Sequence, residues 1–305
     1  MPVEGAHMEG LRSVLEERSR EWSRFRATHP ERSLALGDVT WRYLIGGDGP
    51  DTVLFLPGGL RFADPFFVIL TALEHEHRVI APSYPPLPTM AALLSGIGAI
   101  LDVEGVRRVH VLGESFGGEL AQCVVRQYPD RVDRLILANT APPHHLLAWP
   151  LAGVMRMLAL APTPALRALG RRLLFRFLSA PPAEEAFWRG VIEDIMFRRF
   201  TRADLMSFFA ETLDFHAHYR FASQDLARWP GRVLIVESRD DRAVPPASRE
   251  ALRQLYPSAA VRTFDRGGHT PWLTEPGAYF SAVRTFLAGR DTRKSEQRVT
   301  PAHRG

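Results

Sequence analysis

Short, largely apolar segments recur along the chain, and segments with helical patterns separate them. Strands are expected at residues 39–45, 52–56, 78–81, 108–112, 132–138, 232–237 and 260–264, and helices at 116–128, 245–256 and 274–287. Successive side chains of a strand point to opposite faces, so strands that are apolar throughout are expected to be covered on both sides. Their alternation with helices predicts an α/β fold with a mostly parallel, doubly wound sheet.

The alternation stops between residues 144 and 229. This stretch shows no convincing strand and is dense in Leu, Met, Phe and Arg. We interpret it as a helical cap inserted into the sheet's connectivity, which leaves residues 34–143 and 230–289 as the α/β core. Residues 1–33 are interpreted as a polar N-terminal leader with some helical character. Residues 290–305 lack apolar periodicity, so a disordered tail is expected there.

A glycine-flanked serine follows one of the expected strands directly. The sequence Gly113-Glu114-Ser115-Phe116-Gly117 fits the pattern G-x-S-x-G, and an expected helix begins at Phe116. A strand–turn–helix of this kind needs a turn so sharp that side chains at the two glycine positions would clash. The helix also directs its positive N-terminus at the serine, where negative charge would develop. We therefore predict that Ser115 is a nucleophile.

A serine hydroxyl needs a base, and the base needs a carboxylate to orient it. After such an elbow the acid and then the histidine follow along the chain. Asp240 and Asp241 come after the expected strand 232–237, and His269 comes after the strand 260–264. Loops at the ends of parallel strands are where open α/β sheets carry their functional groups. Each residue alone could be an ordinary loop residue, but their joint occurrence in this order favours a Ser-acid-His triad.

These motifs together resemble the α/β-hydrolase superfamily. The resemblance rests on Pro57-Gly58-Gly59 after a strand, on the elbow at 113–118, on Asp241 and on Gly268-His269, and it spans about residues 34–143 and 230–288. It implies the α/β-hydrolase fold and favours Asp241 over Asp240, because the family's acid lies four residues before a helix-opening proline. The segments Arg78–Tyr84 and Arg134–Asn139 are also weakly similar to maspardin-like members.

Two backbone N–H groups are expected to form the oxyanion hole. One belongs to Phe116, directly after the nucleophile, and the other to Gly59 or Leu60. The family usually has His-Gly at this turn, whereas this chain has Pro57-Gly58.

The composition argues against several other classes of protein. The formal excess of cations is +4, but residues 290–305 hold five cations and two anions, so the remainder is nearly balanced and no nucleic-acid partner is expected. The only lysine, Lys294, lacks the glycines of a P-loop, and the only cysteine, Cys123, cannot form an intramolecular disulfide. No cofactor and no metal ion are expected.

The sequence also bears on where the protein would work. The N-terminal residues lack the apolar core of a secretory signal, and prolines and polar residues interrupt the uncharged stretch 135–155. We therefore expect a cytoplasmic protein with a small-molecule, ester-like substrate, and we do not expect it to work on a membrane.

The predicted activity is hydrolysis of a small carboxylic ester through an acyl-enzyme. The same triad would also cleave lactones, thioesters or the carbon–carbon bond of a diketone, and the sequence leaves these alternatives open. Two further alternatives are a non-catalytic binding protein on a hydrolase scaffold and a membrane-surface lipase that uses the cap. Neither the substrate nor the oligomeric state is set by the sequence.

Overall fold

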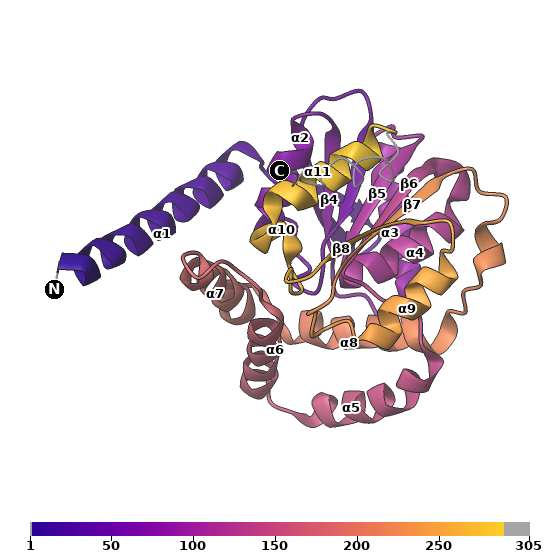
Figure 1. Ribbon diagram of the computed structural model, residues 1–305. Helices are drawn as coiled ribbons and strands as arrows, with labels where there is room; N and C mark the ends of the chain where they lie inside the picture. Colours follow the sequence, from indigo (N-terminus) through magenta and orange to yellow (C-terminus); the bar gives the residue numbers. More distant parts are fainter. Residues whose placement is uncertain (1, 290–305) are drawn as a thin grey trace, which may run out of the picture.

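One eight-stranded sheet forms the centre of the computed structural model, which describes residues 2–289 (Figure 1). Its strands are β1 (Arg32–Leu36), β2 (Val39–Gly46), β3 (Thr52–Leu56), β4 (Arg78–Ser83), β5 (Val109–Glu114), β6 (Val132–Ala138), β7 (Arg232–Ser238) and β8 (Ala260–Phe264). They are arranged in the order β1-β2-β4-β3-β5-β6-β7-β8. Strand β2 runs antiparallel to β1 and to β4, and every other neighbouring pair is parallel.

Helices cover both faces of this sheet. The helices are α1 (Pro2–Thr28), α2 (Phe67–Glu74), α3 (Met90–Val103), α4 (Phe116–Gln127), α5 (Ala148–Leu160), α6 (Thr163–Phe177), α7 (Glu185–Asp194), α8 (Arg202–His218), α9 (Pro246–Leu255), α10 (Pro271–Thr274) and α11 (Pro276–Leu287). Val53 and Phe55 of β3 pack with α2 and α11, whereas Leu54 and Leu56 pack with α3 and α4 on the other face. The predicted doubly wound α/β fold is confirmed.

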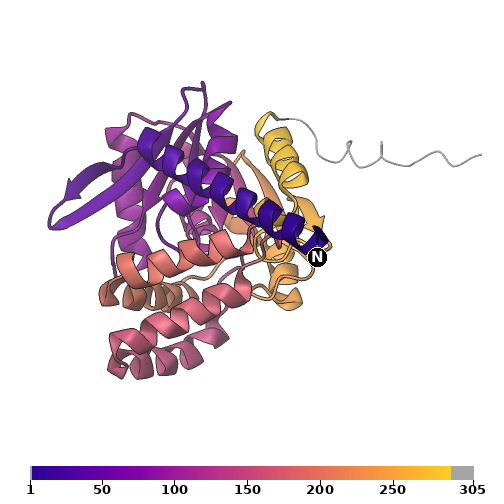
Figure 2. The same ribbon diagram turned by 90° about the vertical axis from the view of Figure 1, so that its left-hand side faces the viewer.

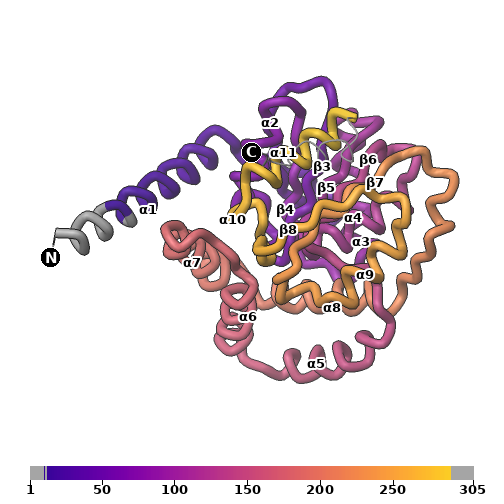
Figure 3. The backbone as a smooth tube through the Cα atoms, in the orientation of Figure 1, coloured from indigo at the N-terminus to yellow at the C-terminus, as the bar shows by residue number. Residues whose placement is uncertain are grey.

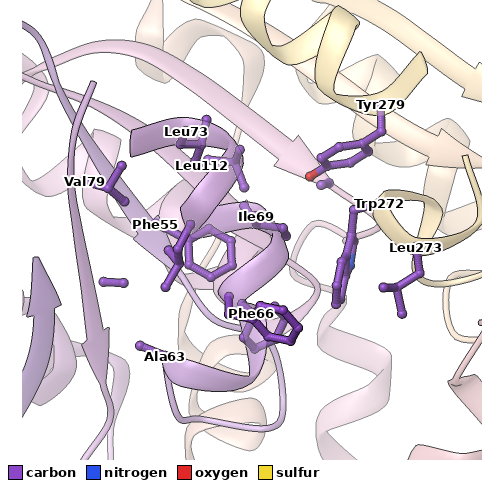
Figure 4. Packing of buried hydrophobic residues seen from close by; sticks show 14 of the residues in the cluster. Phe55, Ala63, Phe66, Ile69, Leu73, Val79, Leu112, Trp272, Leu273 and Tyr279 are labelled. Atoms are coloured by element: carbon purple, nitrogen blue, oxygen red, sulfur yellow. The ribbon is translucent and has the colours of Figure 1, made fainter. Parts of the chain in front are cut away.

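The apolar core between the sheet and helices α2 and α11 also fixes the short helix α10, which begins two residues after His269. Phe66, at the start of α2, lies 5.2 Å from Phe55 of β3 and 5.7 Å from Trp272 of α10, measured between ring centroids. Figure 4 shows Trp272 between Phe66 and the fully buried Tyr279 of α11. The sheet core therefore also holds the chain that follows the predicted catalytic histidine.

Helices α5–α8, called the cap helices below, lie between β6 and β7. In Figures 1 and 2, α5 and α6 form their outer layer, farther from the sheet than α8. The N-terminus of α8 has a capping box, in which Thr201 Oγ1 accepts from the N–H of Asp204 and Asp204 Oδ2 accepts from the N–H of Thr201 at 2.8 Å. The boundaries 144–229 of the cap stay a prediction.

Helix α1 lies outside the sheet, as the chain trace in Figure 3 shows, and it contacts α7. Arg18 pairs with Glu184 at 2.8 Å, and the rings of Trp22 and Phe187 are 5.9 Å apart. The N-terminal segment, interpreted from the sequence as a polar leader with some helical character, therefore packs against the cap helices. The expected disorder of residues 290–305 falls outside the described residues.

Four elements outside the cap were not anticipated from the sequence: β1, α2, α3 and α10. Helix α3 contains two glycines and is apolar on most sides, so it lacks a helical polar–apolar period. A Cβ on Gly96 would overlap the indole of Trp41, so the glycine permits the close packing of α3 on the sheet. Within residues 2–289, no helix is long and apolar enough to cross a membrane.

Candidate active site

Ser115 lies in the strained turn between β5 and α4. Its φ of 55° and ψ of −119° place it in a backbone region that non-glycine residues rarely adopt. A Cβ on Gly117 would overlap the carbonyl of Leu56, and one on Gly113 would overlap that of Gly117. The Ser115 N–H donates to the carbonyl of Ala138 at 2.9 Å, which ties the turn to β6. The two glycines therefore allow the turn, and the turn exposes the hydroxyl at the sheet edge.

His269 reaches this hydroxyl from the loop after β8. Its Nε2 lies 2.9 Å from Ser115 Oγ. Gly268, with φ of 59°, turns the loop, and its N–H donates to Asp240 Oδ1 at 2.8 Å. The N–H of His269 donates to Ser179 Oγ at 3.2 Å, just beyond the end of α6. The imidazole is thus held both by the core and by the cap helices.

Asp241, and not Asp240, faces the imidazole. His269 Nδ1 lies 2.9 Å from Asp241 Oδ2 and 3.1 Å from Oδ1, and the carboxylate is almost fully buried. Burial alone would raise the pKa of Asp241, but the contacts with His269, Asn139 and the N–H of Ala243 hold it below its ordinary value. Asp241 therefore stays ionised beside the imidazole, as a group that stabilises an imidazolium must.

Asn139 supports Asp241 and was not singled out as a functional residue in the sequence. It lies at the end of β6 with φ of 45°, and its Nδ2 donates to Asp241 Oδ2 at 2.9 Å and to the carbonyl of Gly268 at 3.1 Å. The sequence signal that could have identified Asn139 is its position, because it is a polar residue directly after an apolar strand that neighbours the strand of the elbow. One amide therefore sets the distance between the acid loop and the histidine loop.

Replacing Asn139 tests this support. In Asn139→Ala we expect kcat/KM to fall about tenfold or more and unfolding to become easier by about 1–3 kcal/mol, because buried acceptors lose their donor. The pKa of Asp241 should rise. A lowered pKa of Asp241 stabilises the fold above its unfolded-state pKa, and this stabilisation is lost as the pH falls through its folded-state pKa. The free energy of unfolding of the variant should therefore rise less between acid and neutral pH than that of the wild type.

The measurements for this variant are kcat/KM and urea unfolding at acid and neutral pH. Asn139→Gly is the matched control, because glycine removes the amide without the cost of a positive φ. An Asn139→Gly protein with wild-type activity and stability would contradict the role given to the amide.

The turn after β3 lies beside the elbow. A Cβ on Gly58 would come within 3.3 Å of Ser115 Cβ, and Gly58, Gly59 and Leu60 line the same cavity as Ser115. Phe116 opens α4 directly after the serine. These positions suit two backbone donors on one side of Ser115 Oγ, and the choice between Gly59 and Leu60 stays a prediction.

A residue of this turn reaches into the cap. Arg61 has φ of 64° and is fully buried, and its guanidinium binds Glu211 of α8 at 2.5 and 3.2 Å and the carbonyl of Pro85 at 2.9 Å. The turn that would carry the oxyanion donor is therefore joined to a cap helix by a buried ion pair.

A cavity of about 230 Å³ opens onto Ser115 and His269. The cap side contributes Leu173, Leu174 and Phe177 of α6, Trp188 and Ile192 of α7, and Leu205, Phe208 and Phe209 of α8. No Lys or Arg is among the residues that line it. Such a wall favours an apolar, uncharged group next to the nucleophile.

Glu114 is the one acidic side chain among these lining residues. It is buried, and neither carboxyl oxygen forms a hydrogen bond within the described part of the chain. Burial raises the pKa of Glu114 well above its usual value, and the charge of Asp241 raises it further. Both effects favour the neutral carboxyl over the charged carboxylate at this position.

A serine elbow at the carboxyl edge of a parallel sheet, with a histidine and a buried aspartate in hydrogen-bond contact, is the arrangement of hydrolases with an α/β-hydrolase fold. A family model described as the alpha/beta hydrolase fold matches residues 51–276. The chain therefore belongs to the α/β-hydrolase family. The resemblance inferred from the motifs is confirmed, as is the coarser expectation of a hydrolase.

Three curated relatives are similar to the chain in amino-acid sequence. The chain is 27% identical to the 2-hydroxymuconate semialdehyde hydrolase of Pseudomonas putida over 81% of this chain and 87% of that protein. It is 28% identical to a putative carbamate hydrolase, RutD, of a Caulobacter species over 80% and 88%. It is also 28% identical to a 2-hydroxy-6-oxononadienedioate/2-hydroxy-6-oxononatrienedioate hydrolase of Burkholderia vietnamiensis, over 63% of this chain and 66% of that protein, just under two thirds of its length.

Solved structures place the fold in the same group. A hydrolase from Pseudomonas aeruginosa superposes with a TM-score of 0.70 at 25% identity, over 85% of this chain and 98% of that one. The enol-lactonase from Burkholderia xenovorans superposes with a TM-score of 0.68 at 21% identity, over 84% and 100%. The second likeness concerns the fold alone.

Proposed function

We propose that the chain is a serine-dependent hydrolase that transfers an acyl group from a small, largely apolar substrate to water. The observation that carries the proposal is the 2.9 Å distance from Ser115 Oγ to His269 Nε2, with the buried Asp241 carboxylate on the other imidazole nitrogen. A hydroxyl at this distance can lose its proton to the imidazole as it attacks a carbonyl.

In this mechanism Ser115 Oγ attacks the carbonyl carbon and its proton moves to His269 Nε2. Asp241 stabilises the imidazolium, and the N–H groups of Phe116 and of Gly59 or Leu60 stabilise the oxyanion. The bond to the leaving group then breaks, and the leaving group takes the proton from His269. Water, deprotonated by His269, attacks the acyl-enzyme, releases the carboxylic acid and restores the serine.

The bond that breaks is proposed to be a carbon–carbon bond next to a ketone or aldehyde carbonyl. The names of two of the relatives support this choice, because one is a hydrolase of 2-hydroxymuconate semialdehyde and the other a hydrolase of 2-hydroxy-6-oxononadienedioate and 2-hydroxy-6-oxononatrienedioate. The 2-hydroxy group of such a dienoate first gives up its proton to the carbon next to the 6-oxo group, so that a 2-oxo group forms and that carbon becomes saturated. The electron pair of the broken bond then passes to this carbon and is delocalised through the remaining double bond into the 2-oxo group. The carbon is then protonated from His269, so the triad needs no further co-reactant.

Ester hydrolysis, the activity expected from the sequence, is the second candidate. The cavity favours it, since no Lys or Arg among the lining residues could pair with the carboxylate of a dienoate. An apolar ester needs no such partner, and its alcohol leaves with the same proton from His269. Apolar lactones and thioesters also need no cationic partner.

A matched substrate panel separates the two candidates. We expect 2-hydroxy-6-oxo-dienoates with an apolar 6-substituent to be hydrolysed with a kcat/KM at least about tenfold above that of p-nitrophenyl butyrate, with mass spectrometry used to identify the acid released. The reverse preference would establish the ester candidate. Turnover that is equal in wild-type protein and in Ser115→Ala would contradict both candidates.

A further inference from the structure

The outer face of the cap helices carries an unusual concentration of exposed apolar side chains. Eight of the twelve exposed large apolar residues among the described side chains lie between residues 146 and 173. They are Leu146, Leu147, Trp149, Val154, Met157, Leu160, Leu169 and Leu173. Exposed apolar residues gathered in this way mark a surface that binds something.

Helix α5 is apolar on both of its sides. Leu151, Met155 and Leu158 are partly or fully buried and face the protein. On the opposite side Trp149 is 87% exposed, Met157 68% and Leu160 88%. Packing among the described residues therefore explains only one side of α5, and the other side is exposed.

The same segment is strongly cationic. Residues 144–183 contain five arginines and no Asp or Glu. Arg171 pairs with Glu193 at 3.4 Å and Arg167 donates to the carbonyl of Phe200, whereas Arg156, Arg172 and Arg176 form no ion pair within residues 2–289. We call the exposed apolar residues and these three arginines the outer cap face.

We propose that the outer cap face docks on an anionic lipid bilayer, with α5 lying in the plane of the headgroups. Trp149, Met157 and Leu160 would enter the acyl boundary, while Arg156, Arg172 and Arg176 would meet lipid phosphates. The proposal differs from the expectation, drawn from the sequence, that the protein does not work on a membrane. It concerns attachment to one leaflet, for which no spanning helix is needed.

Charge and shape favour lipid over a second copy of the chain. A two-fold dimer through this face would bring two arginine-rich surfaces together without an acidic residue from 144–183 on either side. The face is also carried by the outermost helices, as Figure 2 shows, so it projects from the molecule.

The cavity lies directly behind this face. Leu173 of α6 is both 37% exposed on the outside and part of the cavity wall, and Gly170, Leu174 and Phe177 of the same helix continue that wall. Docking would therefore bring the apolar cavity next to a reservoir of apolar molecules.

Vesicle flotation with the full-length protein tests the docking without any substrate. Vesicles of phosphatidylcholine and phosphatidylglycerol in a 7:3 ratio should bind the wild type at least about tenfold more tightly than phosphatidylcholine alone, and added salt should weaken the binding. Trp149→Ser/Met157→Ser/Leu160→Ser should weaken it more than about a hundredfold. Arg156→Gln/Arg172→Gln/Arg176→Gln should also lose about a hundredfold, at roughly fivefold for each arginine.

Val103→Ser on α3 is the matched control, because Val103 is 62% exposed and lies outside the outer cap face. It should bind vesicles like the wild type, and all variants should keep the wild-type thermal midpoint because they alter exposed residues. The basic stretch 290–305 is unchanged in every variant, so it cannot account for a difference between them.

Three outcomes would overturn the proposal. The first is that the 7:3 vesicles do not bind the wild type. The second is that the serine triple variant binds like Val103→Ser. The third is that equilibrium sedimentation finds a dimer that dissociates in the serine triple variant, since this would assign the face to a second copy.

Discussion

Ser115→Ala is expected to lower kcat by about four to six orders of magnitude while leaving the fold intact. The alanine removes the hydroxyl that lies within hydrogen-bond reach of His269 Nε2, and what remains is binding and oxyanion stabilisation. A fluorophosphonate should label the wild type at one site and should not label the variant. Steady-state kinetics on the substrate panel and intact-protein mass spectrometry measure the two effects.

Ser95→Ala is the matched control, since Ser95 is an exposed serine on α3. It should keep full activity and full labelling. If Ser115→Ala kept more than about a tenth of the wild-type kcat, or if the label were found elsewhere, the acyl-enzyme mechanism would be wrong. A wild type that fails to react with the probe while folded would instead favour the non-catalytic binding protein.

Glu211→Ala is expected to destabilise the fold by about 3–5 kcal/mol, the largest stability effect we expect. Arg61 and Glu211 are both fully buried, so the truncation would leave the guanidinium away from water with no carboxylate partner, beside the carbonyl of Pro85 and the ring of Tyr84. Urea unfolding measures the change. Activity should fall as well, because Arg61 belongs to the turn that carries Gly59 and Leu60.

Two further variants separate the charge from the packing. Arg61→Met/Glu211→Leu should recover most of the lost stability, because it removes both charges and keeps the volume. The exposed pair Arg12–Glu16, with side chains 80% and 53% exposed, should change stability by less than about 0.5 kcal/mol when Glu16 is replaced by alanine. A Glu211→Ala protein as stable as Glu16→Ala would refute the role given to the buried pair.

The parts of the site that could be predicted from sequence are those with local signals. Gly113 and Gly117 are required by one sharp turn, and the turn needs no knowledge of the rest of the chain. Asp241 and His269 stand directly after apolar strands, and parallel strands bring their carboxyl ends to one edge. The structure accordingly places these residues in contact.

The parts that could not be predicted depend on partners far apart in the chain. Asn139 and Asp241 are 102 residues apart, and Arg61 and Glu211 are 150 apart. Ser179 meets His269 across 90 residues. No periodicity links such pairs, because each contact forms only after the sheet order and the path of the cap helices are set.

The substrate is hidden from the sequence for the same reason. Phe177, Trp188 and Phe208 come from three different cap helices, and their common cavity exists only in the packed state. Helix α3 shows a related limit, because its side chains are apolar in too many directions for the period to be visible.

The contact at Ser179 joins the end of α6 to the loop that carries His269. The hydroxyl that accepts from the backbone of His269 lies only two residues beyond α6, and the neighbouring Thr270 is bound by the backbone N–H of Ser179. If α6 swung outward to admit a molecule, it would pull on the loop that carries the imidazole. The triad would then lose its geometry while the cavity is open and recover it as α6 returns, so each substrate and product exchange would pass through an inactive form.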